Sequence, residues 1–473
     1  MPDVLRNSLI YNWIASVGNW FSRQFKGSRI ISRFLKEGST QEVSEGSIFT
    51  KLFYFKVRLF RRLFSSLRLD KLLEGSIFKM PFVWCFFAVV LAPVLPTMGV
   101  LALTMAGFLS LIFKLSCEKD FKLRYNPLNK YILIYAFVYL AATFTSVNVK
   151  GSLYGSILSI AFMLFYFVVI NAVQTKKQLY LLTFFFVCFG VLISLYGFYQ
   201  YLNPSKFSGS WIDTEMFSDI GFRVYSTLGN PNVLGEYLLL TIPLAVSFFF
   251  SVKGVLKKSF FVIVGGIQML CLILTYSRGC WLGILFAAMV FLVLLDRRFI
   301  LIIIVGLMLM PFVLPETIIN RFMSIGNMSD SSTSYRFFIY MGTLSMLKDY
   351  WLCGVGPGTA AFNLVYPSYA YDSIIAPHSH NLYLQTMCDA GICGIAMLLA
   401  IIYRVFKSCA IGLKNSVDKK DKIFIIGVVA SLSGFFVQSM FDYTFYNYRV
   451  MFLFWAVVGL AMLYSDAYKL KEE

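Results

Sequence analysis

The chain has little charge and very few histidines. Only 14% of its 473 residues are charged, and only two are histidine. Apolar residues make up 58% of the chain, whereas soluble globular domains are about 45–50% apolar. Runs of about 18 or more nearly uncharged residues follow one another, and each is long enough to cross the hydrocarbon layer as a helix. This composition excludes an ordinary soluble domain and predicts an all-α polytopic membrane protein.

Other patterns that would indicate a different class are also missing. The ten-residue alternation typical of outer-membrane barrels does not occur. The nine Cys are scattered through apolar segments with no CxxC pair, so we expect neither a zinc site nor a disulfide framework, and no cofactor is indicated. The net charge of +18 does not indicate a nucleic-acid partner here, because an excess of Lys and Arg is typical of the cytoplasmic loops of membrane proteins.

The apolar segments predict about twelve transmembrane helices. We expect them at approximately residues 81–96, 98–113, 130–147, 153–172, 179–202, 232–251, 258–276, 280–295, 299–314, 382–405, 423–441 and 448–465. Basic residues gather in alternate connections, such as "TKKQ", "VKGVLKK" and "DRR". By the positive-inside rule, both termini are cytoplasmic and the remaining connections face outward. Two outward connections are long, at residues 203–231 and 315–381, and the second precedes the tenth span.

The chain therefore divides into an N-terminal extension, residues 1–79, and a membrane domain, residues 80–473. Within the extension, "KVRLFRRLFSSLRLDK" (56–71) is basic and amphipathic. This pattern favours a helix on an anionic membrane surface, and the alternative is a poorly ordered basic tail.

Three outward arginines are candidates for binding an anion. Arg223 lies in "GFRVYSTLGNPNVLGEY" before a span, Arg278 lies in the short turn "LTYSRGCWLG", and Arg336 begins an amphipathic segment. An Arg at membrane depth costs roughly 2.5–3.5 kcal/mol and normally faces a polar cavity. Its planar guanidinium suits phosphate because it can bind two oxygens at once. The alternative is an anchor whose side chain extends to the lipid head groups.

His378 and His380 lie just before the tenth span, separated by one residue. No Cys, Asp or Glu clusters beside them in the sequence, so we expect no metal there. His380, followed by Asn381 at a helix entrance, is the better candidate for acid/base chemistry, and the alternative is a loop histidine bonded to the backbone. We expect Asp389 to make a structural bond between helices. Glu236, near the outer end of its span, is a weaker candidate for lining the site.

Four segments together resemble a known family. "HNLYLQTMCDAGICG", with His380, Gly391 and Gly394, is similar to the signature of the O-antigen ligase and O-antigen polymerase superfamily. "SRGCWLG" resembles its Arg-x-x-x-Leu element, the segment around Arg223 resembles the one that carries its other essential Arg, and "YWLCGVGPGTAAF" resembles its Gly-rich stretch. The four segments occur in the family's order, between about residues 130 and 465.

The resemblance implies a GT-C-like fold and a metal-independent glycosyltransferase in the cytoplasmic membrane. Its donor would be an oligosaccharide on undecaprenyl diphosphate, and its acceptor a glycan or lipid-linked glycan at the outer face. The resemblance further implies that Arg223 and Arg278 bind the diphosphate and that His380 activates the acceptor hydroxyl. It assigns no role to His378, which either assists or shapes the turn. A polymerase and a ligase are not separated by these motifs. The competing hypothesis is a transporter or flippase of lipid-linked glycan. It predicts charged or broken helices in the middle of the membrane and two repeated halves of the chain.

Overall fold

The computed structural model describes most of the chain as helices joined by loops. It covers residues 48–68, 75–118, 120–207, 221–313, 316–324 and 330–470, together with the single residues 16 and 326. The chain separates into two compact units, residues 1–63 and 64–473. The second unit contains every apolar helix and every described candidate site residue.

Helix α5 (Ile48–Ser66) confirms a helix in the basic amphipathic segment. Leu52, Phe55, Leu59 and Leu63 are all half-exposed, and their spacing of three or four residues places them on one face. Residues 69–71 of the predicted segment lie outside the described residues. The position of this helix on a membrane surface stays a prediction.

All twelve predicted apolar segments contain a helix. In chain order these are α7 (Pro81–Leu91), α8 (Thr97–Cys117), α9 (Asn129–Phe144), α10 (Val149–Ala172), α11 (Lys176–Leu202), α12 (Pro231–Ser251), α13 (Val255–Leu274), α14 (Arg278–Leu295), α15 (Ile300–Val313), α19 (Leu382–Asn415), α20 (Lys419–Gln438) and α21 (Tyr448–Ser465). Within the described part of the chain, nine helices are long and apolar enough to cross a membrane. The three shorter ones are α7, α9 and α15, so a polytopic helical membrane protein is confirmed, while a count of twelve spans stays a prediction.

Helices α12, α20 and α21 form the centre of this unit, and most of their residues are buried. The pair α14 and α20 packs at close range because glycines face each other. A Cβ atom at Gly283 would lie 2.7 Å from the carbonyl oxygen of Gly434. Small residues that allow backbones to approach are typical of contacts between membrane helices.

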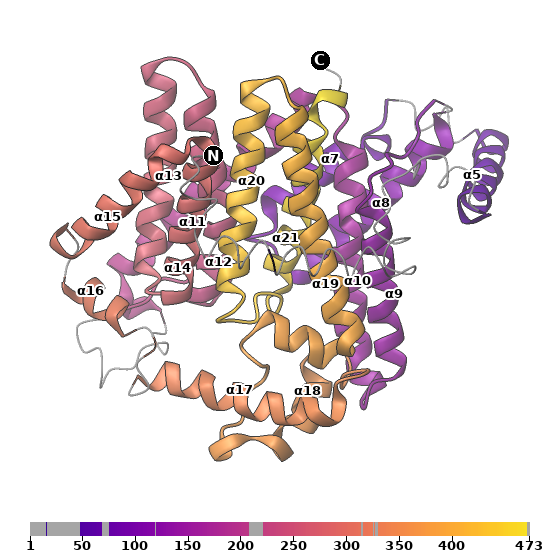
Figure 1. Ribbon diagram of the computed structural model, residues 1–473. Helices are drawn as coiled ribbons and strands as arrows, with labels where there is room; N and C mark the ends of the chain where they lie inside the picture. Colours follow the sequence, from indigo (N-terminus) through magenta and orange to yellow (C-terminus); the bar gives the residue numbers. More distant parts are fainter. Residues whose placement is uncertain are drawn as a thin grey trace. The chain divides into compact units, whose positions relative to one another are not determined.

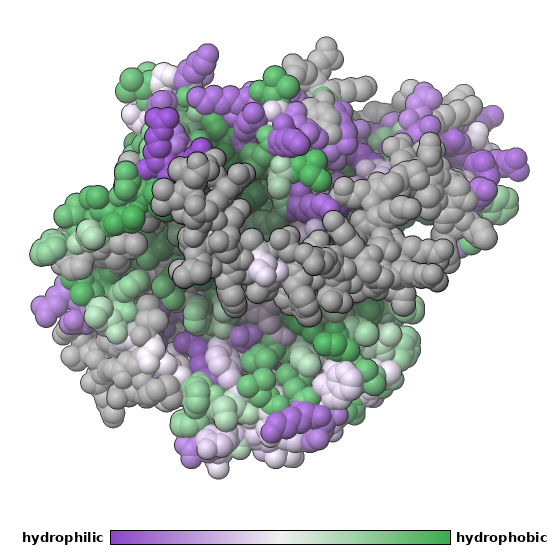
Figure 2. Space-filling view, in the orientation of Figure 1, coloured by the Kyte–Doolittle hydropathy of each residue, from purple (hydrophilic) through white to green (hydrophobic). Residues whose placement is uncertain are grey.

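The connections predicted to face outward meet at one end of this unit. The Val147 amide donates to the Val355 carbonyl, and the Leu382 amide donates to the Ser439 carbonyl. Figure 1 shows α17 (Ser331–Tyr350) and α18 (Thr359–Val365) at this end, and the α12–α13 connection at the other. In Figure 2 hydrophilic residues gather around the end that carries the α12–α13 connection, above a hydrophobic band. The gathering of outward connections agrees with the alternating topology, and which end faces the cytoplasm stays a prediction.

Several helices at the end with α17 and α18 begin at a capping Asn or Asp. The side chains of Asn230, Asp330 and Asn381 accept backbone N–H groups from the first turns of α12, α17 and α19. Such caps satisfy amides that have no partner inside the helix. They also fix three helix N-termini, which carry partial positive charge, around the region described next.

Candidate functional site

A cavity of about 720 Å³ opens at the end of the membrane helices where the connections predicted to face outward meet. Its wall combines the first turns of α12 and α17, the turn before α19 and the α20–α21 connection. Five of the seven predicted site residues line it, namely Arg223, Glu236, Arg336, His378 and His380. The structure thus brings together residues that are more than 150 positions apart in the chain.

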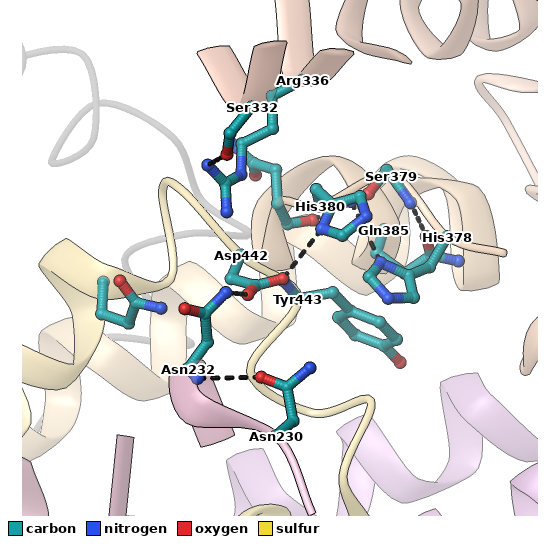
Figure 3. A network of polar contacts seen from close by, with 12 residues as sticks. Asn230, Asn232, Ser332, Arg336, His378, Ser379, His380, Gln385, Asp442 and Tyr443 are labelled. Atoms are coloured by element: carbon teal, nitrogen blue, oxygen red, sulfur yellow. Dashed lines mark hydrogen bonds and ion pairs between the residues drawn. The ribbon is translucent and has the colours of Figure 1, made fainter. Parts of the chain in front are cut away.

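His380 is held in a defined orientation beside an aspartate. Its Nδ1 lies 3.0 Å from Oδ1 of Asp442, as Figure 3 shows, and its backbone carbonyl accepts a hydrogen bond of 3.0 Å from the Tyr340 hydroxyl. Its φ of 48° lies in the left-handed region, which is uncommon for residues other than glycine. A carboxylate partner at Nδ1 favours the tautomer with the proton on Nδ1. Nε2 is then the nitrogen that can accept a proton.

Asp442 is a site residue that the sequence analysis missed. The Asn232 side-chain amide donates to its Oδ2 at 2.8 Å, so both carboxylate oxygens have partners. Burial on its own would raise the pKa of this carboxyl, but the hydrogen bond and charge of His380, with the charge of Arg336, bring the pKa below its ordinary value. No acid lies beside the histidines in the sequence, and the fold brings Asp442 to His380 from a distant connection. The available signal was an acid in the short outward connection "FDYTFYNYR", 62 residues from His380.

His378 supports its neighbour. Its Nδ1 accepts the backbone N–H of His380 at 3.2 Å, and the two rings lie 4.2 Å apart. Burial lowers the pKa of His378 to about 3, and His380 adds to the shift, so His378 is neutral at physiological pH. Potential metal-binding atoms of His378, His380 and Asp442 all lie within 4.8 Å of one another, which is compatible with a cation. However, His380 Nδ1 is already bonded to Asp442, and His378 Nδ1 already accepts a backbone amide.

Arg223 lies at the edge of the cavity, where two of its nitrogens donate hydrogen bonds. Its Nε donates to the Thr275 carbonyl at 2.9 Å, and its Nη2 donates to the Asn232 side-chain oxygen at 3.1 Å. Burial lowers the pKa of Arg223 to about 9, and the charges of Arg321 and Arg336 act in the same direction. Arg223 therefore remains a cation at neutral pH, in a place where other cations disfavour its charge. An anionic ligand would relieve that repulsion.

Arg278 lies behind this cavity, in a small adjoining pocket that Arg223, Arg321 and Arg336 also line. It pairs with Asp330, the N-cap of α17, and donates to the Ser324 hydroxyl at 2.8 Å. Asp330 also lies 3.7 Å from Arg321, a residue for which the sequence indicated no special role. Among the residues that the structure describes, one carboxylate thus serves two of the four arginines that line this pocket.

Arg336 reaches the cavity from α17, on the side of the His380–Asp442 pair (Figure 3). Its Nη1 donates to the Ser332 hydroxyl at 2.9 Å, while its buried Nε has no hydrogen-bond partner. A buried guanidinium donor without a partner costs free energy. This donor is consequently available to a ligand oxygen.

The remaining predicted residues have different places: Asn381 caps a helix, Glu236 lines the cavity, and Asp389 bonds neighbouring elements. Asn381 does not line the cavity: it caps α19 and donates to the Met440 carbonyl at 2.9 Å, which positions the turn that carries His380. Glu236 lines the cavity, and its Oε2 is buried without a hydrogen-bond partner. Asp389 accepts hydrogen bonds from Tyr443 and Tyr139 on neighbouring elements, which confirms its predicted structural role.

The comparison with protein families bears on this geometry. Residues 260–399 match the family model described as O-antigen ligase. They form an O-antigen ligase domain. The predicted resemblance to the O-antigen ligase and polymerase superfamily is thereby confirmed. No curated protein matches the chain.

The O-antigen ligase domain contains part of the site. The matched segment extends from α13 into α19 and includes Arg278, Arg336 and both histidines, whereas Arg223 and Asp442 lie outside it. Together with the nine candidate spans among the described residues, this domain indicates an integral membrane protein. The family implies a glycosyltransferase-like enzyme of cell-surface polysaccharide biosynthesis that acts on lipid-linked glycan and a polysaccharide acceptor.

Proposed function

We propose that this protein transfers an oligosaccharide from undecaprenyl diphosphate to an acceptor sugar at the outer face of the cytoplasmic membrane. The observation that carries the proposal is the cavity itself. There, a histidine oriented by a carboxylate shares the wall with a cluster of arginines. A sugar hydroxyl needs a base to take its proton, and a diphosphate leaving group needs cations to stabilise its charge. One cavity contains both kinds of group.

The reaction forms one bond and breaks another. The acceptor hydroxyl oxygen bonds to the anomeric carbon of the donor, while the bond from that carbon to the diphosphate oxygen breaks. The hydroxyl proton passes to Nε2 of His380, and Asp442 stabilises the resulting imidazolium, as a buried carboxylate does beside a catalytic histidine. The electron pair of the broken bond stays on the diphosphate, whose added charge is stabilised by Arg223 and Arg336, with Arg278 behind them.

The proposed transfer does not depend on a metal ion. A cation bound to Nε2 of His380 would occupy the nitrogen that has to accept the hydroxyl proton in the proposed reaction. The arginine cluster also raises the electrostatic cost of a divalent cation. We therefore expect transfer by the purified protein to continue in excess chelator. Loss of activity in chelator, with recovery on adding a divalent metal, would contradict this part of the proposal.

The surface polysaccharide of a strain that lacks the protein tests the function. A polymerase predicts loss of long chains with single repeats still attached, whereas a ligase predicts accumulation of full-length glycan on the lipid carrier. A transporter predicts that labelled lipid-linked glycan moves across the bilayer of liposomes that contain the protein, and that no glycans are joined. Unchanged surface polysaccharide in the deletion strain would reject the transferase.

A further inference from the structure

A second cavity, of about 810 Å³, adjoins the one that contains His380. The beginnings of α8, α10, α18 and α21 and the end of the α20–α21 connection form its wall. Tyr443 and Tyr446 line both cavities. The two spaces therefore share a wall immediately beside the histidines.

The chemistry of the second cavity differs from that of the first. Four of its lining residues are tyrosines, and Tyr154 and Tyr448 meet edge to face with centroids 6.4 Å apart. Its only lining cation, among the residues that the structure describes, is Arg449. Arg449 donates to the carbonyls of Pro93, Thr227 and Leu228, so its donors are directed at the protein. This cavity consequently offers aromatic faces and hydroxyls, and it lacks an arginine cluster for a diphosphate.

Glycines line this cavity where α10 approaches α18, so no side chain projects from the backbone there. A Cβ atom at Gly155 would lie 3.1 Å from the Tyr448 hydroxyl oxygen and 3.3 Å from the Gly358 Cα. Gly358 itself has a φ of 91°, which side chains rarely tolerate. The backbone and tyrosine hydroxyls are thus the polar surface that a ligand meets there.

Successive ring contacts connect the two cavities. The His378 ring lies 4.2 Å from His380 on one side and 4.5 Å from Tyr446 on the other. The arginines lie on the His380 side, and the second cavity lies on the Tyr446 side. A hydroxyl that attacks opposite to the leaving diphosphate has to approach His380 from the side away from the arginines.

We propose that the second cavity binds the acceptor glycan, as a neutral sugar chain whose hydroxyl reaches His380 past His378 and Tyr446. This assignment rests on the proposed transferase function and adds the place and chemical class of the second substrate. Sugar rings present apolar C–H faces and polar edges. A wall of tyrosines suits both, because each ring offers an apolar face and a hydroxyl that can hydrogen-bond.

Photo-crosslinking in living cells tests the assignment without knowledge of the sugar. The photoreactive residue p-benzoylphenylalanine replaces Tyr154, which lines the second cavity, or Tyr403 as a control. Tyr403 is equally exposed, at 55% against 54%, and lines neither cavity. We expect a glycan-bearing adduct from position 154 and none from position 403. Lack of a glycan adduct at 154, or equal adducts at both positions, would overturn the assignment.

The same experiment distinguishes acceptor from donor glycan when it is repeated with Arg278→Ala and, separately, with Arg223→Ala. Both substitutions weaken binding of the donor diphosphate. An acceptor glycan should still cross-link at position 154, whereas a donor glycan should not. Loss of the adduct in both variants, with the proteins present in the membrane, would contradict an acceptor site. The transferase function is judged separately, by the surface polysaccharide of the deletion strain.

Substitutions provide a second measurement. Tyr154→Ala should reduce the glycan transferred to the cell surface about tenfold, a typical effect of losing one aromatic contact, while Tyr154→Phe keeps the ring and should stay within about twofold of wild type. Tyr403→Ala should have no effect. Normal transfer by Tyr154→Ala would contradict a stacking role for this ring.

Discussion

At the scale of single residues, the conformation of His380 is the most informative feature of the structure. A non-glycine residue in the left-handed region costs of order 1–3 kcal/mol, and such strain persists only where the surroundings impose it. Tyr340 holds the carbonyl of His380, His378 accepts its amide, and Asp442 binds its ring. The three contacts direct the ring into the cavity, which gives the strained backbone a functional explanation.

Substitution of Asp442 tests whether this carboxylate supports the base. Asp442→Asn removes the charge that would stabilise a protonated His380 and can present an amide donor where an acceptor is required. We expect transfer by purified protein to fall by about 10²–10⁴-fold, with the donor still bound. Asp349→Asn is the matched control, because Asp349 is exposed, bonds Tyr369 and lines neither cavity. Wild-type transfer by Asp442→Asn would remove this residue from the mechanism.

The arginine cluster makes a different prediction. If the donor diphosphate uses the planar forks of Arg223 and Arg278, substitution by Lys keeps the charge but loses the second hydrogen bond. Arg223→Lys and Arg278→Lys should each reduce surface glycan severely, by tenfold or more, with normal protein in the membrane. Lys114→Arg is the control, because it exchanges Lys and Arg in the last turn of α8, away from the site. Near-normal glycan in both Lys variants would show that positive charge alone is sufficient.

The sequence predicted Arg223, Arg336 and His380, which line one cavity, because each lies in a recognisable segment of a connection predicted to face outward, whereas the predicted Arg278 lies in the adjoining pocket. It did not predict Asp442. Beside the contact between His380 and Asp442, the Leu382 amide donates to the Ser439 carbonyl and joins the start of α19 to the end of α20. Pairing between connections far apart in the chain is set by helix packing, and nothing local in the sequence encodes it.

At the scale of helices, α19 is interrupted where the sequence predicted an uninterrupted span. Ala390 and Gly391 leave the helical conformation, and Gly391 adopts φ 60° and ψ −159°, a region used almost only by glycine. The interruption lets the Ile392 amide bond the Trp351 carbonyl and the Val355 amide bond the Cys388 carbonyl. Apolar periodicity predicts that a segment is helical, but it does not reveal a break made to receive a neighbouring loop.

Gly391→Ala tests this interruption. Its Cβ atom would lie 2.0 Å from the Leu352 carbonyl oxygen, and the backbone conformation alone costs about 1–3 kcal/mol. We expect a clearly lower melting temperature in detergent and reduced transfer. Gly266→Ala on α13, where a Cβ atom meets nothing within 4 Å, should be neutral or slightly stabilising. Equal melting temperatures for the two variants would contradict the strained role of Gly391.

At the scale of the whole molecule, transfer at the outer face of the membrane requires that the two cavities face outward. The alternation of basic connections predicts this orientation, and the structure gathers the other connections at one end. A Cys at Ser331 should react with a membrane-impermeant reagent in intact cells, and a Cys at Lys419 only after permeabilisation, in a background without the exposed Cys353 and Cys393. The reverse labelling pattern would place the site in the cytoplasm and reject the topology.

The most direct test of the central claim is glycan transfer by the purified protein in liposomes that contain lipid-linked glycan and acceptor. We expect the wild-type protein to join the two substrates and His380→Ala to do so about 10²–10⁴-fold more slowly, while still binding the donor through its arginines. His378→Ala should lose much less, because its neutral ring only supports the turn. Full transfer by His380→Ala, or movement of the lipid-linked glycan across the bilayer with no joining by the wild type, would contradict the account.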